Sequence, residues 1–184
     1  MNDEELIQQC LAGDKTAYEK LVLKYQDRLY NTMSRIAENN EDALDVVQET
    51  FLQAYLRLAS FRQSSKFYTW VYRIAFNLAM GLRRKRKPNL SVETMFDEAG
   101  DEPTDDSITP LDRIGNEEMS KILWAAIDRL HDEYRSVIVL REIEGCSYEE
   151  ISQILDLPVG TVRSRLHRAR NLLKDLLQKH ERHF

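Results

Sequence analysis

Apolar residues recur at spacings of three and four over most of the chain, which is the pattern of amphipathic α-helices. No segment keeps the strict alternation of a half-buried β-strand. In the first half, the pattern predicts a short helix near residues 4–11 and three longer helices. Their apolar stripes consist of Ala17, Leu21, Tyr25, Leu29, Met33 and Ile36; of Leu44, Val47, Phe51, Ala54 and Leu58; and of Phe67, Trp70, Val71, Ile74, Leu78 and Leu82.

The helical pattern stops at Pro88 and returns after Asn116. Residues 88–116 hold three of the four prolines and an acidic run, a composition that buries too little apolar surface to offset the entropy of ordering. The sequence therefore predicts an all-α protein with two small helical domains, residues 1–87 and 117–184, joined by a flexible acidic linker.

Within the second domain, residues 147–173 predict a helix-turn-helix. Ser147 and Glu150 have the spacing of a capping box that opens a short helix, and Pro158 ends that helix in a tight turn. A longer helix follows, with Val162, Leu166, Ala169 and Leu173 on one side and Arg163, Ser164, His167, Arg168 and Asn171 on the other. Such a second helix enters the major groove of duplex DNA, where arginine reads guanine. The alternative is an ordinary helical hairpin with a solvated basic face.

The net charge of −5 conceals a strongly segregated pattern. Residues 51–92 carry nine bases and no acid, residues 93–118 carry ten acids and one base, and residues 157–184 carry seven bases and two acids. Two basic blocks separated by an acidic block indicate two surfaces for polyanions. Segregated but merely solvated helix faces are the alternative interpretation.

Residues 61–76 combine six aromatic side chains with bases and contain no acid. Aromatic rings that stack bases, next to cations that follow phosphates, are typical of single-stranded nucleic-acid binding. Phe67 and Trp70 lie on the apolar stripe and are expected in the core, whereas Tyr68, Tyr72 and Arg73 are expected at the surface. The preceding helix, residues 40–58, has an acidic outer face with Asp42 and Asp45, which suits a basic protein partner or simple solvation.

Several functional classes are excluded by what the sequence lacks. No apolar stretch is long enough to span a membrane, and the N-terminus has no signal-peptide pattern, so a cytoplasmic protein without membrane insertion is expected. Cys10 and Cys146 make no metal or disulfide framework, and the acidic run lacks calcium-loop spacing, so no metal or cofactor is expected. An enzyme is disfavoured because no nucleophile and base have the spacing of a catalytic pair. The four histidines, which could act as bases, are scattered along the chain: His131, His167, His180 and His183.

Two parts of the chain resemble a known family. The segments EDALDVVQETFLQAYLRL, FYTWVYRIAFNLA and RRKRK resemble the second conserved region of bacterial extracytoplasmic-function sigma factors, which belong to the sigma-70 family. The segment YRSVIVLREIEGCSYEEISQILDLPVGTVRSRLHRAR resembles their fourth region. The resemblance implies an alternative sigma factor, a non-catalytic subunit that binds core RNA polymerase, directs it to promoters and helps to melt the minus-ten element. A separate anti-sigma factor is its implied regulator.

The resemblance also implies which residues make each contact. Polymerase clamp helices would be bound by Asp45, Gln48 and Glu49, while the flank of the second domain would pack on the polymerase flap. The minus-thirty-five duplex would be read by Arg163, Ser164, His167, Arg168 and Arg170. The minus-ten element, melted to single strands, would be bound by Phe61, Arg62, Ser64, Lys66, Tyr68, Tyr72, Arg73, Asn77, Arg83, Arg84 and Arg86.

An ordinary DNA-binding regulator with an N-terminal helical dimerisation domain is the main competing hypothesis. It predicts tight duplex binding by the free protein and a twofold-symmetric site. It leaves the acid-free aromatic segment and the acidic helix unexplained. A pure adaptor that never contacts DNA would leave the arginine face of residues 163–170 unexplained.

Overall fold

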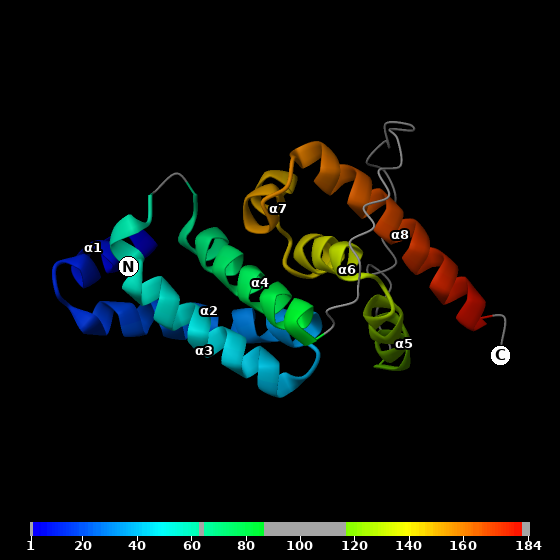
Figure 1. Ribbon diagram of the computed structural model, residues 1–184, viewed down its shortest axis with the longest axis horizontal. Coiled ribbons are helices and arrows are strands. Elements are labelled where there is room, and N and C mark those ends of the chain that lie inside the picture. The colour runs from blue at the N-terminus through cyan, green and yellow to red at the C-terminus, as the bar shows by residue number, and fades with distance from the viewer. Residues whose placement is uncertain (1, 63–64, 87–116, 182–184) are drawn as a thin grey trace. The chain divides into compact units, whose positions relative to one another are not determined.

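The computed structural model describes residues 2–62, 65–86 and 117–181, and these residues form helices joined by short turns (Figure 1). The order of elements is α1 (Asp3–Leu11), α2 (Lys15–Ile36), α3 (Asn40–Leu56), the 3₁₀ turn η1 (Leu58–Ser60), α4 (Phe67–Arg86), α5 (Glu117–Asp128), α6 (Asp132–Ile138), the π-helical turn η3 (Val139–Ile143), α7 (Tyr148–Leu155) and α8 (Val159–Glu181). The predicted all-α class is confirmed.

The first compact unit contains α1 to α4 and η1. Helix α2 is its centre, because it packs against α1, α3 and α4. The apolar stripe predicted for α2 is buried along its whole length, from Ala17 to Ile36. Tyr72 and Phe76 of α4 are also fully buried in the core of the unit.

Side-chain caps determine where the helices of the first unit begin. The Asn2 side chain accepts from the Glu5 amide at 2.8 Å, and the Glu5 carboxylate accepts from the Asn2 amide at 3.1 Å, which is a capping box. Asp14 caps α2 through the Thr16 amide at 2.9 Å. Asn39 caps α3 in the same way, and these caps satisfy amides that would otherwise lack an acceptor.

The second compact unit contains α5, α6, η3, α8 and the beginning of α7. Helix α8 packs against α5 and α6. The core of this unit is apolar and includes Leu123, Ile127, Val137, Ile138, Leu140, Ile151, Val162, Leu166 and Leu173. The predicted helices are confirmed, but the π-helical turn η3 was not foreseen, because a single wide turn leaves no periodic trace in the sequence.

Two positions on α3 differ from the predicted stripe. Leu44 is 48% exposed, and Asp42, expected on the outer face, is only 8% exposed. The stripe is instead completed by Ala43, Val46 and Thr50, which pack inward. The buried Asp42 makes polar contacts with Asn39 and Arg86, which are described below.

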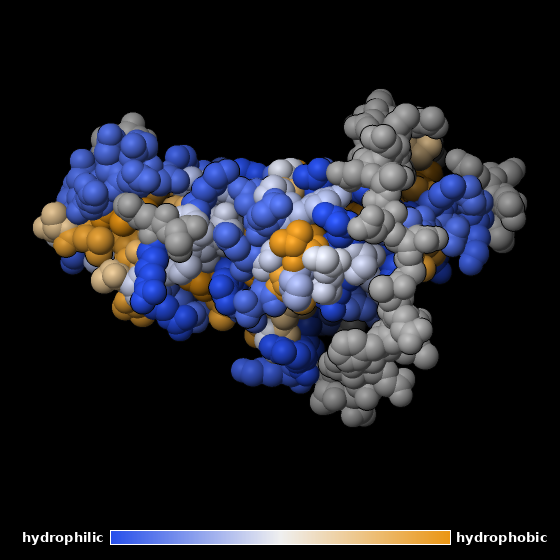
Figure 2. Space-filling view, turned by 90° about the horizontal axis from the view of Figure 1, so that it is seen from above, coloured by the Kyte–Doolittle hydropathy of each residue, from blue (hydrophilic) through white to orange (hydrophobic). Residues whose placement is uncertain are grey.

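The surface of the first unit carries exposed apolar side chains as well as polar ones (Figure 2). Those on its helices are Leu11, Leu23, Leu44, Leu52, Tyr55 and Leu56. Across the ranges that the structure describes, no helix is both long enough and apolar enough to cross a bilayer. The predicted linker, residues 88–116, lies outside the described residues.

Candidate nucleic-acid interface

The helix-turn-helix of the second unit forms as its sequence predicts. The Ser147 amide donates to Glu150 Oε2 at 2.9 Å, and the Glu150 amide donates to Ser147 Oγ at 3.2 Å, so the capping box at the start of α7 is present. Asp156 has a φ of +57° and reverses the chain, and α8 begins at Val159 after Pro158. An aspartate tolerates this left-handed conformation better than most residues.

The recognition face of α8, defined here as Arg163, Ser164, His167 and Arg168, is exposed to solvent. The opposite side of the helix is buried through Val162, Leu166, Ala169 and Leu173. Two contacts order the face itself: Ser164 Oγ donates to the Thr161 carbonyl at 3.0 Å, and the Asn171 amide lies 3.1 Å from His167 Nε2. Its arginines are therefore positioned to meet a polyanion.

Two other arginines of α8 turn toward the body of the unit. Arg170 donates to Glu142 Oε1 from Nε at 3.1 Å and from Nη2 at 2.8 Å, and Arg165 Nη2 lies 2.9 Å from Glu133 Oε2. The expectation that Arg170 contacts DNA stays a prediction; in this structure its guanidinium is joined to Glu142 of η3 and its side chain is 20% exposed. Arg170 and Glu142 lie 28 positions apart, so helical spacing alone does not predict this pair.

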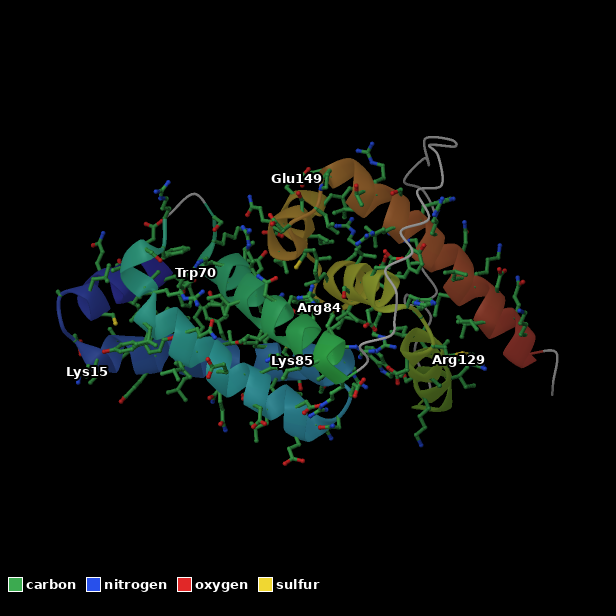
Figure 3. All side chains as sticks on the ribbon, viewed as in Figure 1. Lys15, Trp70, Arg84, Lys85, Arg129 and Glu149 are labelled. Carbon is green, nitrogen blue, oxygen red and sulfur yellow. The ribbon has the colours of Figure 1, made fainter. Side chains whose placement is uncertain are left out.

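In the first unit, an aromatic cluster surrounds the beginning of α4. The Phe61 ring centroid lies 5.1 Å from that of Trp70 and 5.8 Å from that of Phe67, and Phe67 in turn lies 5.8 Å from Tyr25 of α2. Phe67 is buried as predicted, whereas Phe61 and Trp70 remain partly exposed. Figure 3 shows Trp70 at this end of α4. The cluster offers ring surface at the point where the chain enters the helix.

The two tyrosines of α4 have different environments. Tyr72 is 1% exposed, and its hydroxyl lies 3.2 Å from Thr32 Oγ1 of α2, so the prediction that it lies at the surface is wrong. Tyr68 is partly exposed and meets Tyr72 edge-on, with 6.0 Å between ring centroids. Both rings lie on one side of α4, since they are four residues apart.

Two cations flank the Tyr68 ring. The Arg28 guanidinium and the Lys66 ammonium each lie 5.7 Å from its centroid, within the range of cation–π attraction. Sequence reasoning selected Lys66 but missed Arg28, which lies 40 residues before Tyr68 on α2. The helical period alone cannot reveal this juxtaposition, because it depends on how α2 and α4 pack.

The remaining residues of the predicted minus-ten set divide according to exposure. Arg62, Lys66, Arg73 and Asn77 are exposed, whereas Ser64 lies outside the described residues. Arg84 and Lys85 are exposed and extend from the C-terminal end of α4 (Figure 3).

Arg83 and Arg86 of the same basic run bond within the unit. Arg83 Nη1 donates to the Ile36 carbonyl at 2.9 Å, and Arg86 pairs with Asp42 through both Nη atoms. These hydrogen bonds to Asp42 raise the pKa of Arg86 above its usual value. Their expected contact with DNA stays a prediction; in this structure Arg83 bonds to the last residue of α2 and Arg86 to the first turn of α3, and the Arg86 side chain remains 48% exposed.

The acidic side of α3 is exposed at Asp45, Gln48 and Glu49. Glu49 Oε1 accepts from Gln53 Nε2 at 2.8 Å, which orders one turn of this surface. Exposed Leu52 and Leu56 continue it toward the end of the helix at i, i+4 spacing. A helix surface with acids, amides and leucines is suited to a protein partner.

The described residues were also compared with the side-chain groups that hold metal ions in proteins. They contain no group of three or more His, Cys, Asp or Glu residues that could hold a metal ion. The chemical features that they do present are cations, aromatic rings and an acidic helix face.

Comparison with known proteins gives matches to both units. The family profile described as sigma-70 region 2 matches residues 21–88, and that of sigma-70 region 4 matches residues 120–173. The ECF RNA polymerase sigma-E factor of Haemophilus influenzae is 39% identical over 183 residues, covering 97% of this chain and 96% of the relative. The RNA polymerase sigma-H factor of Pseudomonas aeruginosa is also 39% identical, over 96% of this chain and 94% of the relative.

Two solved structures have similar folds over most of the chain. The structure of CnrH in complex with the cytosolic domain of CnrY matches with a TM-score of 0.70 and 28% identity, covering 96% of this chain and 97% of that one. The sigma factor RpoE of Bartonella quintana, solved with the anti-sigma factor NepR, matches with a TM-score of 0.65 and 25% identity, covering 88% and 96%.

Proposed function

The chain belongs to the extracytoplasmic-function sigma factors of the sigma-70 family, and from that membership we propose how its residues divide the work of transcription initiation. As a sigma factor it is a non-catalytic subunit that binds core RNA polymerase and directs it to promoters. The proposed assignment has three parts: residues 1–87 dock on the polymerase and bind the minus-ten element, residues 117–184 bind the minus-thirty-five element, and residues 88–116, which lie outside the described residues, connect the two.

Docking on the clamp helices of the polymerase is assigned to Asp45, Gln48 and Glu49. The support is their exposure on one side of α3. An acidic surface would repel DNA and would attract a basic protein surface. Exposed Leu52 and Leu56 supply apolar area beside the charges.

The minus-ten element is assigned to the aromatic and basic end of α4. The proposed set keeps Phe61, Arg62, Ser64, Lys66, Tyr68, Arg73, Asn77 and Arg84. Tyr72 supports this surface from below, because its ring is buried. Bases of the melted strand would stack on exposed rings, each stack contributing about 1–3 kcal/mol, while the cations follow the phosphates.

The minus-thirty-five element is assigned to the recognition face of α8: Arg163, Ser164, His167 and Arg168. The one-sided exposure of this face, opposite a fully buried apolar stripe, is the observation that carries the assignment. A helix of this kind lies in the major groove with its N-terminal residues at the base edges. The flank of the unit would pack on the polymerase flap.

Regulation by an anti-sigma factor is part of the proposal. Both similar structures named above are complexes, one with the cytosolic domain of CnrY and one with NepR. We propose that an anti-sigma factor likewise binds the present chain and controls it. The chain would then act in the cytoplasm together with the polymerase.

The test is complex formation between the purified protein and sigma-free bacterial core polymerase. The wild-type chain should form a stoichiometric complex, and the double charge reversal Asp45→Arg/Glu49→Arg should abolish it. The matched control is Glu19→Arg/Asp27→Arg, which reverses two exposed acids of α2 and should leave the complex intact. Tight duplex binding by the protein alone, without any polymerase complex, would instead support the ordinary regulator.

A further inference from the structure

The last turn of α4 is attached to two other helices of the first unit. Arg83 Nη1 donates to the carbonyl of Ile36, the last residue of α2, at 2.9 Å. One turn later, Arg86 Nη2 donates to Asp42 Oδ1 at 2.7 Å, and Arg86 Nη1 bonds to Asp42 Oδ2. The same guanidinium lies 3.8 Å from the Glu38 carboxylate.

The Asp42 carboxylate is positioned by contacts at the start of its own helix as well as by Arg86. It lies in the first turn of α3, where a carboxylate is stabilised by the helix dipole. Its amide donates to Asn39 Oδ1 at 2.8 Å, and its Oδ2 accepts from Asn39 Nδ2 at 3.0 Å. With 8% of its surface exposed, this carboxylate depends on its hydrogen bonds in place of water.

The paired guanidinium and carboxylate have the two-pronged geometry that arginine alone can form. The pair uses two of the five N–H donors of Arg86, whose side chain is 48% exposed, so a DNA phosphate that took these two donors would remove Arg86 from Asp42. That exchange would leave a nearly buried carboxylate without its charged partner, which is strongly unfavourable. Arg84 and Lys85 have no such cost, because they extend into solvent from the same turn.

We propose that Arg86, Asp42 and Arg83 form a latch that fixes the basic end of α4 against the beginning of α3. Asp42 precedes Asp45, Gln48 and Glu49 on the same helix, α3. The latch therefore fixes the position of the polymerase-docking surface relative to the outward cations of α4. Arg86 is thus a positioning residue for promoter binding, not a DNA contact. The inference rests on the proposed function of α3 and α4.

The experiment compares Arg86→Gln, Asp42→Asn and the double variant with wild type, each assembled with core polymerase. The readouts are affinity for core, affinity of the assembled polymerase for a pre-melted minus-ten oligonucleotide at several salt concentrations, and amide hydrogen exchange over residues 37–46. Each single variant should weaken oligonucleotide binding roughly five- to thirtyfold. The double variant should lose no more than either single one, because both remove the same contact.

Two further results separate a latch from a DNA contact. The salt dependence of binding should not change in Arg86→Gln, and exchange over residues 37–46 should become faster. Arg84→Gln is the matched control: it should reduce the salt slope by about 0.7 and leave exchange unchanged. Arg86→Lys keeps the charge without the fork and should resemble Arg86→Gln.

Contrary outcomes distinguish the two hypotheses. A lower salt slope in Arg86→Gln, together with a silent Asp42→Asn, would identify Arg86 as a phosphate contact and overturn the latch. Unchanged hydrogen exchange in Arg86→Gln would also overturn it, independently of any polymerase assay. A wild-type chain that fails to bind core polymerase would refute the proposed function of α3 instead.

Discussion

The end of α4 and the recognition helix α8 are both rich in arginine, and both divide their arginines between two directions. In α8, Arg165 and Arg170 pair with Glu133 and Glu142, whereas Arg163 and its neighbours face solvent. In α4, Arg83 and Arg86 bond to a helix-end carbonyl and to Asp42. A count of bases therefore overstates the charge available to DNA in both units.

The two surfaces differ in what accompanies their outward cations. Around α4, the partly exposed rings of Phe61, Tyr68 and Trp70 accompany the basic side chains. The recognition face of α8 has polar side chains and no Phe, Tyr or Trp ring. Rings suit unpaired bases, while a polar arginine face suits the edges of paired ones. The difference is consistent with one unit for melted DNA and one for duplex DNA.

The largest expected effect separates the inward tyrosine of α4 from the outward one. Tyr72→Ala removes a fully buried ring and should lower the free energy of unfolding by about 3–5 kcal/mol. Tyr68→Ala should change it by less than about 1 kcal/mol, because the ring is partly exposed. The two tryptophans allow a local measurement: in a Trp124→Phe background, Trp70 fluorescence reports urea unfolding of the first unit.

DNA binding should depend on the outward tyrosine and not on the inward one. Tyr68→Ala should weaken binding of a single-stranded minus-ten oligonucleotide by about 1–3 kcal/mol. Tyr72→Phe keeps the ring and should leave this affinity unchanged. A larger loss of affinity in Tyr72→Phe than in Tyr68→Ala would contradict the distinction between a supporting and a contacting tyrosine.

A smaller effect separates the two kinds of arginine in α8. Arg163→Ala should cost about 1–3 kcal/mol in affinity of the assembled polymerase for duplex minus-thirty-five DNA, and the loss should depend on base sequence. Arg165→Ala is the matched control on the same helix, because its guanidinium pairs with Glu133. Titration of fluorescent duplexes with single base changes measures both. Equal losses in the two variants would show that the inward pair contributes to recognition.

The sequence predicted those features that depend on neighbouring residues. Helical stripes such as the one from Ala17 to Ile36 follow from a local period, and the Ser147 cap follows from a four-residue pattern. The errors concern contacts between distant positions. Asp42 meets Arg86 across 44 residues, and Tyr72 meets Thr32 across 40.

The same limit applies to the candidate interface. Exposure of Arg163, Ser164, His167 and Arg168 was predictable, because each lies opposite the apolar stripe of its own helix. Arg170 lies on the border of that stripe, where the position of Glu142 decides the direction of the side chain. Helical period alone does not supply that position, so the sequence could not separate the inward arginines from the outward ones.

The two units can also be compared through their capping boxes. Ser147→Ala should lower the free energy of unfolding of the second unit by about 1 kcal/mol, because the Glu150 amide loses its acceptor. Urea unfolding followed by Trp124 fluorescence, in a Trp70→Phe background, measures this. Trp70 fluorescence in the complementary background should not respond, and an equal response would indicate that the units unfold together.

The smallest effect is a pH dependence confined to the first unit. Tyr18 donates its hydroxyl to the Phe51 carbonyl at 2.6 Å, and burial raises its pKa above the usual value. The unfolded phenol ionises near pH 10, so above that pH the unfolded state holds fewer protons than the folded state, and stability falls as pH rises. At pH 10.5 the contribution of Tyr18 to this loss should be about 0.8 kcal/mol relative to pH 8.

Tyr18→Phe removes this titration, so its unfolding free energy should fall less than that of wild type between pH 8 and pH 10.5. Trp70 fluorescence in the Trp124→Phe background provides the measurement. In the described part of the second unit no tyrosine is buried, so Trp124 should report the same pH dependence for Tyr18→Phe and wild type. If the Trp70 curves of the two proteins stayed parallel over this pH range, burial of the phenol would not be the source of the alkaline instability.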